Sequence, residues 1–217
     1  MKYLLLFTIS ILTLYSCENA KIKSVNGVFT DEFKDTWNSP WKHKSNDDIE
    51  YEPHGSHSGF KIRNISKHYT GFNYYDFPVK MMDDFELNLK FMLYGQSTFT
   101  LFIGYKDARH RESLSFSKYK KEFNYTQFDG DGTPLRFKTR CEVNKGYTKF
   151  RDGFNWLKVI KKDNELFVYH NDILLMQGKD LPSFCNSFGF GLGPKTSVYL
   201  RKIEIIETNY NSETKTQ

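Results

Sequence analysis

Trp156-Leu157-Lys158-Val159-Ile160-Lys161 opens the stretch of sequence that decides the fold. A turn at Asp163-Asn164 leads into residues 165–170, and a second turn at Asn171-Asp172 leads into residues 173–176. Short runs of β-branched and aromatic residues, separated by Asn and Asp pairs, are typical of antiparallel strands joined by tight hairpin turns. The stretch therefore predicts a β-meander.

The same pattern continues on both sides of this stretch. In residues 85–93 every second residue is large and apolar, and residues 99–105 and 135–143 repeat the alternation. A period of two places one face of a strand in a core and leaves the other face to solvent. Because no segment shows a useful helical period, we expect an all-β protein.

A glycine-spaced run, Phe188-Gly189-Phe190-Gly191-Leu192-Gly193, and a closing run at residues 197–207 follow the meander. This order resembles the C-terminal half of concanavalin A-like (LamG-like) jelly-roll sandwiches. There a Trp-led strand, a hairpin ending at an Asn turn, a Gly-rich strand and a closing strand recur. Residues 28–33 resemble the opening strand of such domains. The resemblance implies a jelly-roll β-sandwich of two antiparallel sheets.

The first 17 residues have the composition of an export signal. Lys2 provides a positive start, and residues 3–15 are apolar apart from hydroxyl side chains. The run is shorter than the ~20 apolar residues that span a bilayer. Its end, Leu14-Tyr15-Ser16-Cys17, resembles a bacterial lipobox. This predicts a lipoprotein anchored through Cys17 in a bacterial cell envelope, on the periplasmic face or the cell surface.

The rest of the chain reads as one domain. Residues 18–26 are polar and predict a tether, residues 27–208 carry the strand pattern, and residues 209–217 form a polar tail. This length suffices for a sandwich with a full core. With Cys17 lipidated, Cys141 and Cys185 remain. Export permits a disulfide between them, and two separate buried thiols are the alternative.

The formal net charge of +5 is concentrated between residues 118 and 151. This segment contains nine basic residues and four acidic ones. Arginine forks and lysine charges fit carboxylate or sulfate groups, and tyrosine can stack on a sugar ring. We expect a monomer that binds an anionic glycan or an acidic protein surface; a solvated strand face is the alternative explanation. The candidate ligand-binding residues are Lys90, Tyr119, Arg136, Lys138 and Arg140.

Motifs for catalysis are weak. The E-x-D-x-E strand of jelly-roll glucanases, which would pair two carboxylates on one face, does not occur. Glu122-Phe123-Asn124-Tyr125-Thr126-Gln127-Phe128-Asp129 resembles the central strand of 3-keto-disaccharide hydrolase-like proteins, which carry a Glu, a Gln and an Asp in a similar row. A glycoside hydrolase is therefore one alternative function. An inhibitor or immunity-type lipoprotein that binds a partner protein is another.

Cofactors are not expected. Asp129-Gly130-Asp131-Gly132 is similar to a fragment of a calcium loop, but a full cage needs six or more oxygen ligands, so a tight turn is the preferred interpretation. Nucleic acid is not expected as a partner, because an exported lipoprotein would seldom meet it. Five aromatic residues are assigned to folding rather than to ligand: Trp156, Phe167, Tyr169, Phe188 and Phe190.

Overall fold

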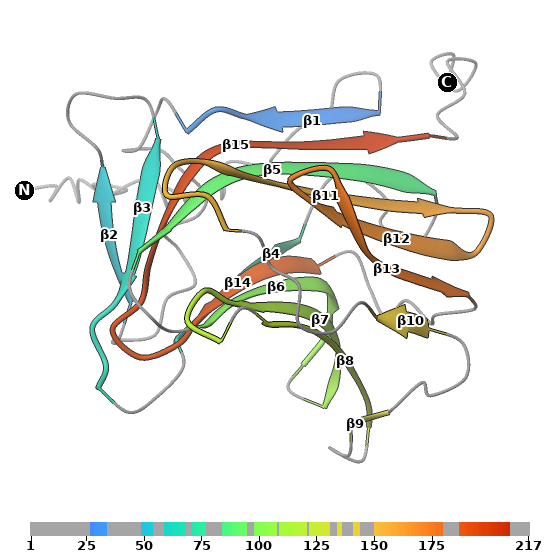
Figure 1. Ribbon diagram of the computed structural model, residues 1–217, viewed down its shortest axis with the longest axis horizontal. Helices are drawn as coiled ribbons and strands as arrows, with labels where there is room; N and C mark the ends of the chain where they lie inside the picture. Colours follow the sequence, from blue (N-terminus) through green and yellow to red (C-terminus); the bar gives the residue numbers. More distant parts are fainter. Residues whose placement is uncertain are drawn as a thin grey trace, which may run out of the picture.

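Two antiparallel β-sheets lie face to face in the structure, a computed structural model (Figure 1). It describes residues 27–33, 49–53, 59–67, 71–76, 84–94, 98–107, 109–120, 122–130, 134–135, 141–143, 150–179 and 187–208. The predicted all-β sandwich of two sheets is confirmed.

The larger sheet contains nine of the described strands, in the order β10-β13-β12-β11-β5-β15-β3-β2, and β1 pairs with β15 beside this path. The order brings strands from both ends of the chain together around the central pair β5 and β15. The strands are β1 (Val28–Asp31), β2 (Ile49–Pro53), β3 (Phe60–Asn64), β5 (Phe85–Tyr94), β10 (Cys141–Val143), β11 (Asn155–Lys162), β12 (Glu165–His170), β13 (Ile173–Lys179) and β15 (Ser197–Glu207).

The smaller sheet contains six of the described strands, in the order β4-β14-β6-β7-β8-β9. They are β4 (Gly71–Asp76), β6 (Thr98–Tyr105), β7 (His110–Ser117), β8 (Glu122–Asp129), β9 (Pro134–Leu135) and β14 (Ser187–Leu192). The Gly-rich run of the sequence becomes β14, which lies between β4 and β6.

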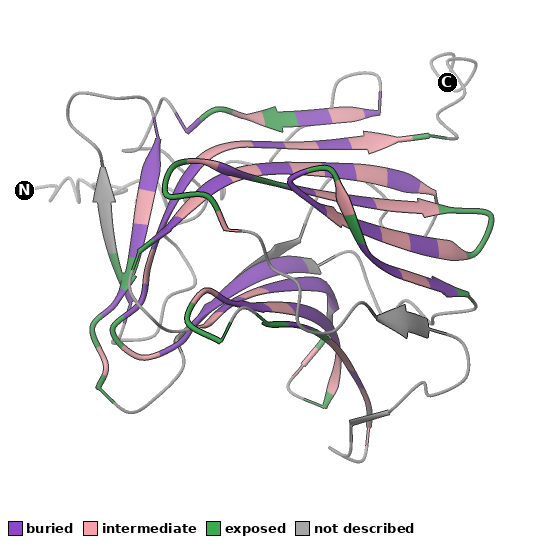
Figure 2. Ribbon diagram, in the orientation of Figure 1, coloured by how far each residue is buried: buried purple, intermediate pink, exposed green. Residues whose placement is uncertain are grey.

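The core lies between the two sheets, and the inward faces of both contribute to it. Burial alternates residue by residue along β5, β11 and β12 (Figure 2). Leu87 pairs across β5 with Val159 on one side and Ile205 on the other, and all three are fully buried. This register places one apolar row of the larger sheet against the smaller one. The alternation predicted for residues 85–93 is confirmed.

Both predicted turns of the meander are two-residue hairpin turns. Asp163 and Asn164 have φ of 50° and 64°, and Asn171 and Asp172 have φ of 49° and 69°. Positive φ at both central positions fits the type I′ turn, whose twist matches that of the flanking strands. Asn and Asp tolerate this conformation better than most residues with a side chain.

The two described ends of residues 135–143, whose alternation predicts a single strand, pair with different strands. β9 pairs with β8 in the smaller sheet, whereas β10 pairs with β13 in the larger one. The two described ends of this run therefore belong to different sheets. Alternation shows which residues face inward, but it does not determine which strand is the partner.

The predictions for the signal, the tether and the polar tail fall on residues 1–26 and 209–217, outside the described residues. Cys17 and Cys185 lie outside them too, and Cys141 begins β10 at the edge of the larger sheet. The lipid anchor and the Cys141–Cys185 disulfide therefore remain predictions. No helix in the described part of the chain is long and apolar enough to cross a bilayer.

Candidate functional site

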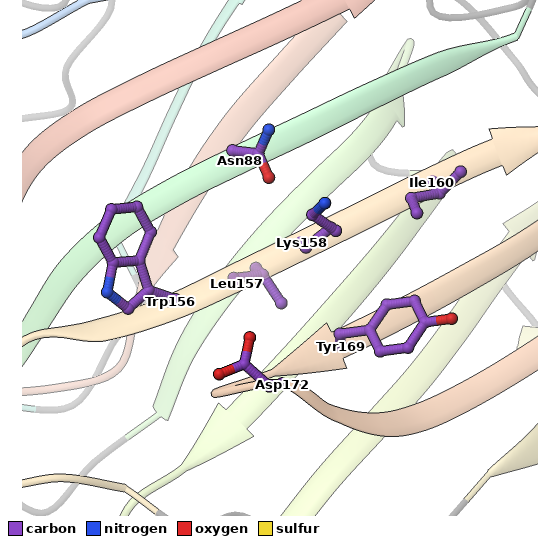
Figure 3. Close-up of a pocket in the computed structure, with 7 residues that line it drawn as sticks. All are labelled: Asn88, Trp156, Leu157, Lys158, Ile160, Tyr169 and Asp172. Carbon is purple, nitrogen blue, oxygen red and sulfur yellow. The ribbon is translucent and has the colours of Figure 1, made fainter.

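A hollow of about 450 Å³ lies on the outer face of the nine-stranded sheet. We call it the Trp156 pocket. Trp156 lies at one end and Ile160 at the other, and Asp172 lies between Trp156 and Tyr169 in the view of Figure 3. The lining residues come from β5, β11, β12 and the β12–β13 turn: Asn88, Trp156, Leu157, Lys158, Ile160, Tyr169 and Asp172.

The register of the sheet brings the lining residues together. Lys158 of β11 lies directly opposite Asn88 of β5 on one side and Tyr169 of β12 on the other. Trp156, two residues earlier, lies opposite Lys90. Residues directly opposite each other on neighbouring strands have Cβ atoms about 5 Å apart and interact. The pocket is therefore built on paired strands, which hold side chains more rigidly than loops do.

Trp156 is the large aromatic residue of the pocket that solvent reaches most, with 42% of its surface exposed. The Lys90 ammonium lies 4.9 Å from the centre of the Trp156 ring and 5.0 Å from the centre of the Phe154 ring. A cation at this distance is attracted to the negative face of an aromatic ring, by about 0.5–1 kcal/mol at an exposed site. Lys90 therefore restricts the orientation of the indole.

The backbone at Trp156 is held by two buried asparagines. The Trp156 amide donates to Asn171 Oδ1 at 2.9 Å, and Asn171 Nδ2 donates to Asn155 Oδ1, also at 2.9 Å. Asn155 Nδ2 in turn donates to the carbonyl of Gly153 at 3.1 Å. Buried amides satisfied in this way are costly to break and favour one arrangement. The network fixes the β12–β13 turn, and with it Asp172, against the start of β11.

The charge of Lys158, which lines the pocket, is compensated by Glu86, which is not a lining residue. Lys158 Nζ lies 2.9 Å from Glu86 Oε1, and Asn88 Nδ2 donates to the same oxygen at 2.9 Å. Partial burial tends to raise the pKa of Glu86, but the hydrogen bonds from Asn88 and Lys158 outweigh it and hold the pKa below the ordinary value. Glu86 is therefore ionised at neutral pH and balances the charge of Lys158.

The charge of Asp172, unlike that of Lys158, is not compensated by a neighbouring side chain in the described part of the chain. Asp172 lies in the exposed turn, and within the described part of the chain no hydrogen bond or ion pair reaches its carboxylate. The pocket therefore combines two aromatic rings, an amide, a neutralised lysine and one carboxylate open to a ligand. Pockets of 300–1,000 Å³ with mainly apolar walls and a few polar groups suit small organic ligands.

The structure describes two of the five predicted ligand-binding residues. Lys90 is on β5 in the larger sheet, beside the Trp156 pocket. Tyr119 is 70% exposed in the turn between β7 and β8, in the smaller sheet. Arg136, Lys138 and Arg140 lie outside the described residues. Lys90 and Tyr119 belong to different sheets, but Lys118 of the Tyr119 turn lies 3.7 Å from Asp152, two residues before the Phe154 ring that Lys90 contacts. A role of any of the five in binding stays a prediction.

Two residues of the pocket were assigned to folding on sequence grounds. Phe188 and Phe190 are buried as that assignment requires, but Trp156 is exposed and Tyr169 is only half-buried at the pocket wall. The alternation already contained a signal: Trp156 is in phase with Lys158 on the polar face of its strand. A Trp on a polar face deserves to be considered as a contact residue.

The row that suggested a sugar hydrolase does not lie on one face. β8 alternates, so Glu122 is exposed, whereas Gln127 is fully buried between the sheets. Glu122 and Gln127 are five positions apart, and an odd separation places them on opposite faces of a strand. These two side chains therefore do not form a shared surface of the kind that a sugar hydrolase would need.

Another carboxyl group, Glu112 of β7, is buried between the sheets. Tyr125 donates its hydroxyl hydrogen to Glu112 Oε1 at 2.7 Å. Burial raises the pKa of Glu112 to about 8, despite the opposing effects of the Tyr125 hydrogen bond and the charge of Lys161. Glu112 is therefore protonated at neutral pH.

The calcium-loop fragment is only partly described. Asp129 ends β8 and Gly130 follows it with φ of 79°, whereas Asp131 and Gly132 lie outside the described residues. Among the residues that the structure describes, no group of three or more His, Cys, Asp or Glu side chains could hold a metal ion.

The paired antiparallel sheets form a jelly-roll sandwich, and solved structures that include one with a galectin-like fold are similar to it. A Bacillus subtilis protein of unknown function with a galectin-like fold superposes with a TM-score of 0.62 at 12% identity, over 82% of this chain and 94% of its own.

Two further solved structures share the fold. The exoplasmic/lumenal domain of VIP36, in its Ca2+/Man-bound form, gives a TM-score of 0.56 at 11% identity, over 86% of this chain and 91% of its own. The GH16 protein of the mixed linkage glucan PUL of Bacteroides ovatus, in complex with its G4G4G3G product, gives 0.53 at 8% identity, over 87% and 98%. No protein-family model matches the chain, and no curated protein matches its sequence. At these identities the likeness concerns the fold.

Proposed function

We propose that the protein binds carbohydrate in the Trp156 pocket. The observation that carries the proposal is the position of Trp156, which is exposed, held by Lys90 and the Asn171 side chain, and set at the rim of a hollow with polar side chains. It is a rigid aromatic surface that no other part of the described chain covers completely.

The chemistry of the pocket suits a sugar ring. One face of a pyranose carries C–H groups and is apolar, while its edge carries hydroxyl groups. Trp156 and Tyr169 offer large, rigid aromatic surfaces for the apolar face. Asn88 and Asp172 offer hydrogen-bonding groups for the hydroxyls. A pocket of this kind binds through stacking and orients its ligand with a few polar contacts.

The solved neighbours support the class of ligand without locating it. VIP36 was solved in a Ca2+/Man-bound form, and the Bacteroides ovatus GH16 protein with a saccharide product. The fold is therefore compatible with saccharide ligands in both binding proteins and enzymes. A shared fold does not by itself transfer a function, so the proposal depends on the residues of the pocket.

Binding is favoured over hydrolysis because the pocket lacks a pair of lining carboxyl groups. Glycoside hydrolysis needs a pair of them, about 5–9 Å apart, across the scissile bond. The residues that line the pocket include a single carboxylate, Asp172. Binding of a sugar is favoured over a partner protein because the pocket is a hollow with aromatic walls rather than a flat basic patch.

Trp156→Ala is expected to lower the affinity for a polysaccharide that the wild type binds by a factor of roughly thirty. Truncating a central aromatic contact commonly costs at least about 2 kcal/mol of binding free energy. Affinity electrophoresis in gels containing mixed-linkage glucan, mannan or levan measures the effect.

Tyr119→Ala is the matched control, since Tyr119 is also an exposed aromatic residue but belongs to the other sheet. If Tyr119→Ala lost binding and Trp156→Ala kept it, the ligand would bind on the smaller sheet and the proposed site would be wrong.

The anionic ligand expected from the sequence depends on Arg136, Lys138 and Arg140, so it remains a separate proposal for that region. We also propose that the domain is held at an envelope membrane through Cys17, as its lipobox-like sequence suggests. Expression in a bacterium with radiolabelled palmitate is expected to label the wild type and not Cys17→Ser. Equal labelling of both would contradict the anchor.

A further inference from the structure

We propose that the Trp156 pocket selects uncharged glycans, and that Asp172 is the residue that recognises their hydroxyl groups. This inference rests on the proposed function and names its ligand class. It differs from the sequence expectation of an anionic ligand, and it rests on the charges that surround the pocket, on the hydrogen-bonding chemistry of a carboxylate and on the geometry of one turn.

Three lysines among the described residues near the pocket each have a partner. Lys158 is paired with Glu86 at 2.9 Å, and Lys202 with Glu204 at 2.9 Å on the strand that flanks β5. The Lys90 ammonium lies over the rings of Phe154 and Trp156. An anionic sugar would have to compete with these partners for each cation. The lysines therefore serve to hold the pocket rather than to attract negative charge.

The carboxylate of Asp172 points to the same ligand class. An ionised carboxylate only accepts hydrogen bonds, so it needs donors from its ligand. Sugar hydroxyls are donors, and neighbouring hydroxyls can reach both oxygens of one carboxylate. The carboxylate group of a uronate and a sulfate ester have no donor to offer, and their negative charge is repelled by that of Asp172. Asp172 and Trp156 line the same pocket, and the amide of Asn171, the residue before Asp172, donates to the Trp156 carbonyl (Figure 3). A ring stacked on the indole would therefore present its edge to this carboxylate.

The backbone at Asp172 makes this role testable. Asp172 has φ of 69° at the second position of its turn, where glycine is at least as well suited. Loss of the Asp172 side chain therefore relieves the turn instead of straining it. Asn164 has φ of 64° at the same position of the equivalent turn at the other end of β12. Asp172→Gly and Asn164→Gly are thus matched changes, and only the first alters the pocket.

The experiment measures binding of the full chain to neutral polysaccharides (mixed-linkage glucan, mannan and levan) and to polygalacturonate. We expect the wild type to prefer a neutral polymer. Asp172→Gly is expected to bind that polymer about tenfold more weakly, the size of effect that follows from losing a hydrogen bond to a charged group. Asn164→Gly is expected to bind like the wild type, and Asp172→Gly is expected to unfold at or above the wild-type temperature. Asp172→Asn keeps the shape of the side chain and removes its charge. It is expected to reduce the ratio between the affinity for the neutral polymer and the affinity for polygalacturonate.

The outcomes separate this inference from the proposal on which it rests. Unchanged affinity of Asp172→Gly, or tighter wild-type binding to polygalacturonate than to every neutral polymer, overturns the inference while Trp156→Ala still reports on the pocket. Equal loss in Asp172→Gly and Asn164→Gly also overturns it, because the effect would then come from the hairpin. If the wild type and Trp156→Ala bind each polymer equally, or the wild type binds none, the proposed function itself fails.

Discussion

Glu112→Gln is expected to stabilise the protein increasingly as pH rises, by roughly 5 kcal/mol relative to the wild type between pH 4.5 and 8. Burial raises the pKa of Glu112 to about 8, from an ordinary value of 4.5. Over this interval the folded wild type keeps a proton that the unfolded chain releases. The contribution of Glu112 to the free energy of unfolding is therefore fully present below the ordinary pKa of 4.5, and it is lost as pH rises through the folded-state pKa of about 8. Glutamine has no proton to lose.

His170 acts in the opposite direction. It is fully buried on the inward face of β12, with its ring centre 4.9 Å from that of Phe150. Burial, with a smaller effect of the Arg151 charge, lowers its pKa to about 4, from 6.5. Because the unfolded state then binds the extra proton, stability rises with pH across this interval. Between pH 4.5 and 6.5 the effects of Glu112 and His170 on the free energy of unfolding nearly cancel. Between pH 6.5 and 8 only the Glu112 effect acts, and it lowers the free energy of unfolding by roughly 2 kcal/mol.

Urea unfolding between about pH 5 and 8 measures these slopes as differences between variants. Glu122→Gln is the matched control, because Glu122 lies on the neighbouring strand and is exposed. The change in slope is expected to be larger for Glu112→Gln than for this control. A Glu112→Gln profile parallel to that of the wild type would show that the Glu112 carboxyl is ionised in the folded protein.

Phe116→Ala is expected to lower the free energy of unfolding by about 3–5 kcal/mol. Phe116 is fully buried, and its ring centre lies 5.2 Å from that of Phe123 and 6.4 Å from that of Phe99 within the smaller sheet. It also lies 5.7 Å from the ring of His170, which belongs to the larger sheet. Its loss would therefore leave a cavity between the sheets and remove contacts from both of them.

Denaturant unfolding of Phe116→Ala and of Tyr119→Ala compares a buried and an exposed aromatic residue at the same end of β7. Tyr119→Ala is expected to change stability by less than about 0.5 kcal/mol. If Phe116→Ala had an equally small effect, the sandwich would not be packed around this residue.

Much of the fold could be predicted from the sequence because its signals are local. The alternation of residues 85–93 and the Asn and Asp turns of the meander each depend on a few neighbouring residues, and the structure has all of them. Strand pairing is not local. Residues 135–143 alternate like one strand, yet their two ends pair in different sheets. That outcome depends on the partners β8 and β13.

The site was harder to predict for the same reason. Lys90 and Trp156 become neighbours only when β5 pairs with β11, and Asp172 joins them through the turn that Asn171 anchors. Lys90 was a candidate because it is a cation on a polar strand face. Its contact with two aromatic rings, which gives it a supporting role, is a product of sheet register. Trp156 was assigned to folding because aromatic residues usually fill such cores.

A crystal structure of the protein soaked with a mixed-linkage glucan oligosaccharide tests the central claim most directly. We predict a sugar ring stacked on Trp156, with hydroxyl groups within hydrogen-bonding distance of Asp172, on the outer face of the nine-stranded sheet. A sugar bound instead on the outer face of the six-stranded sheet, beside Tyr119, would contradict the account.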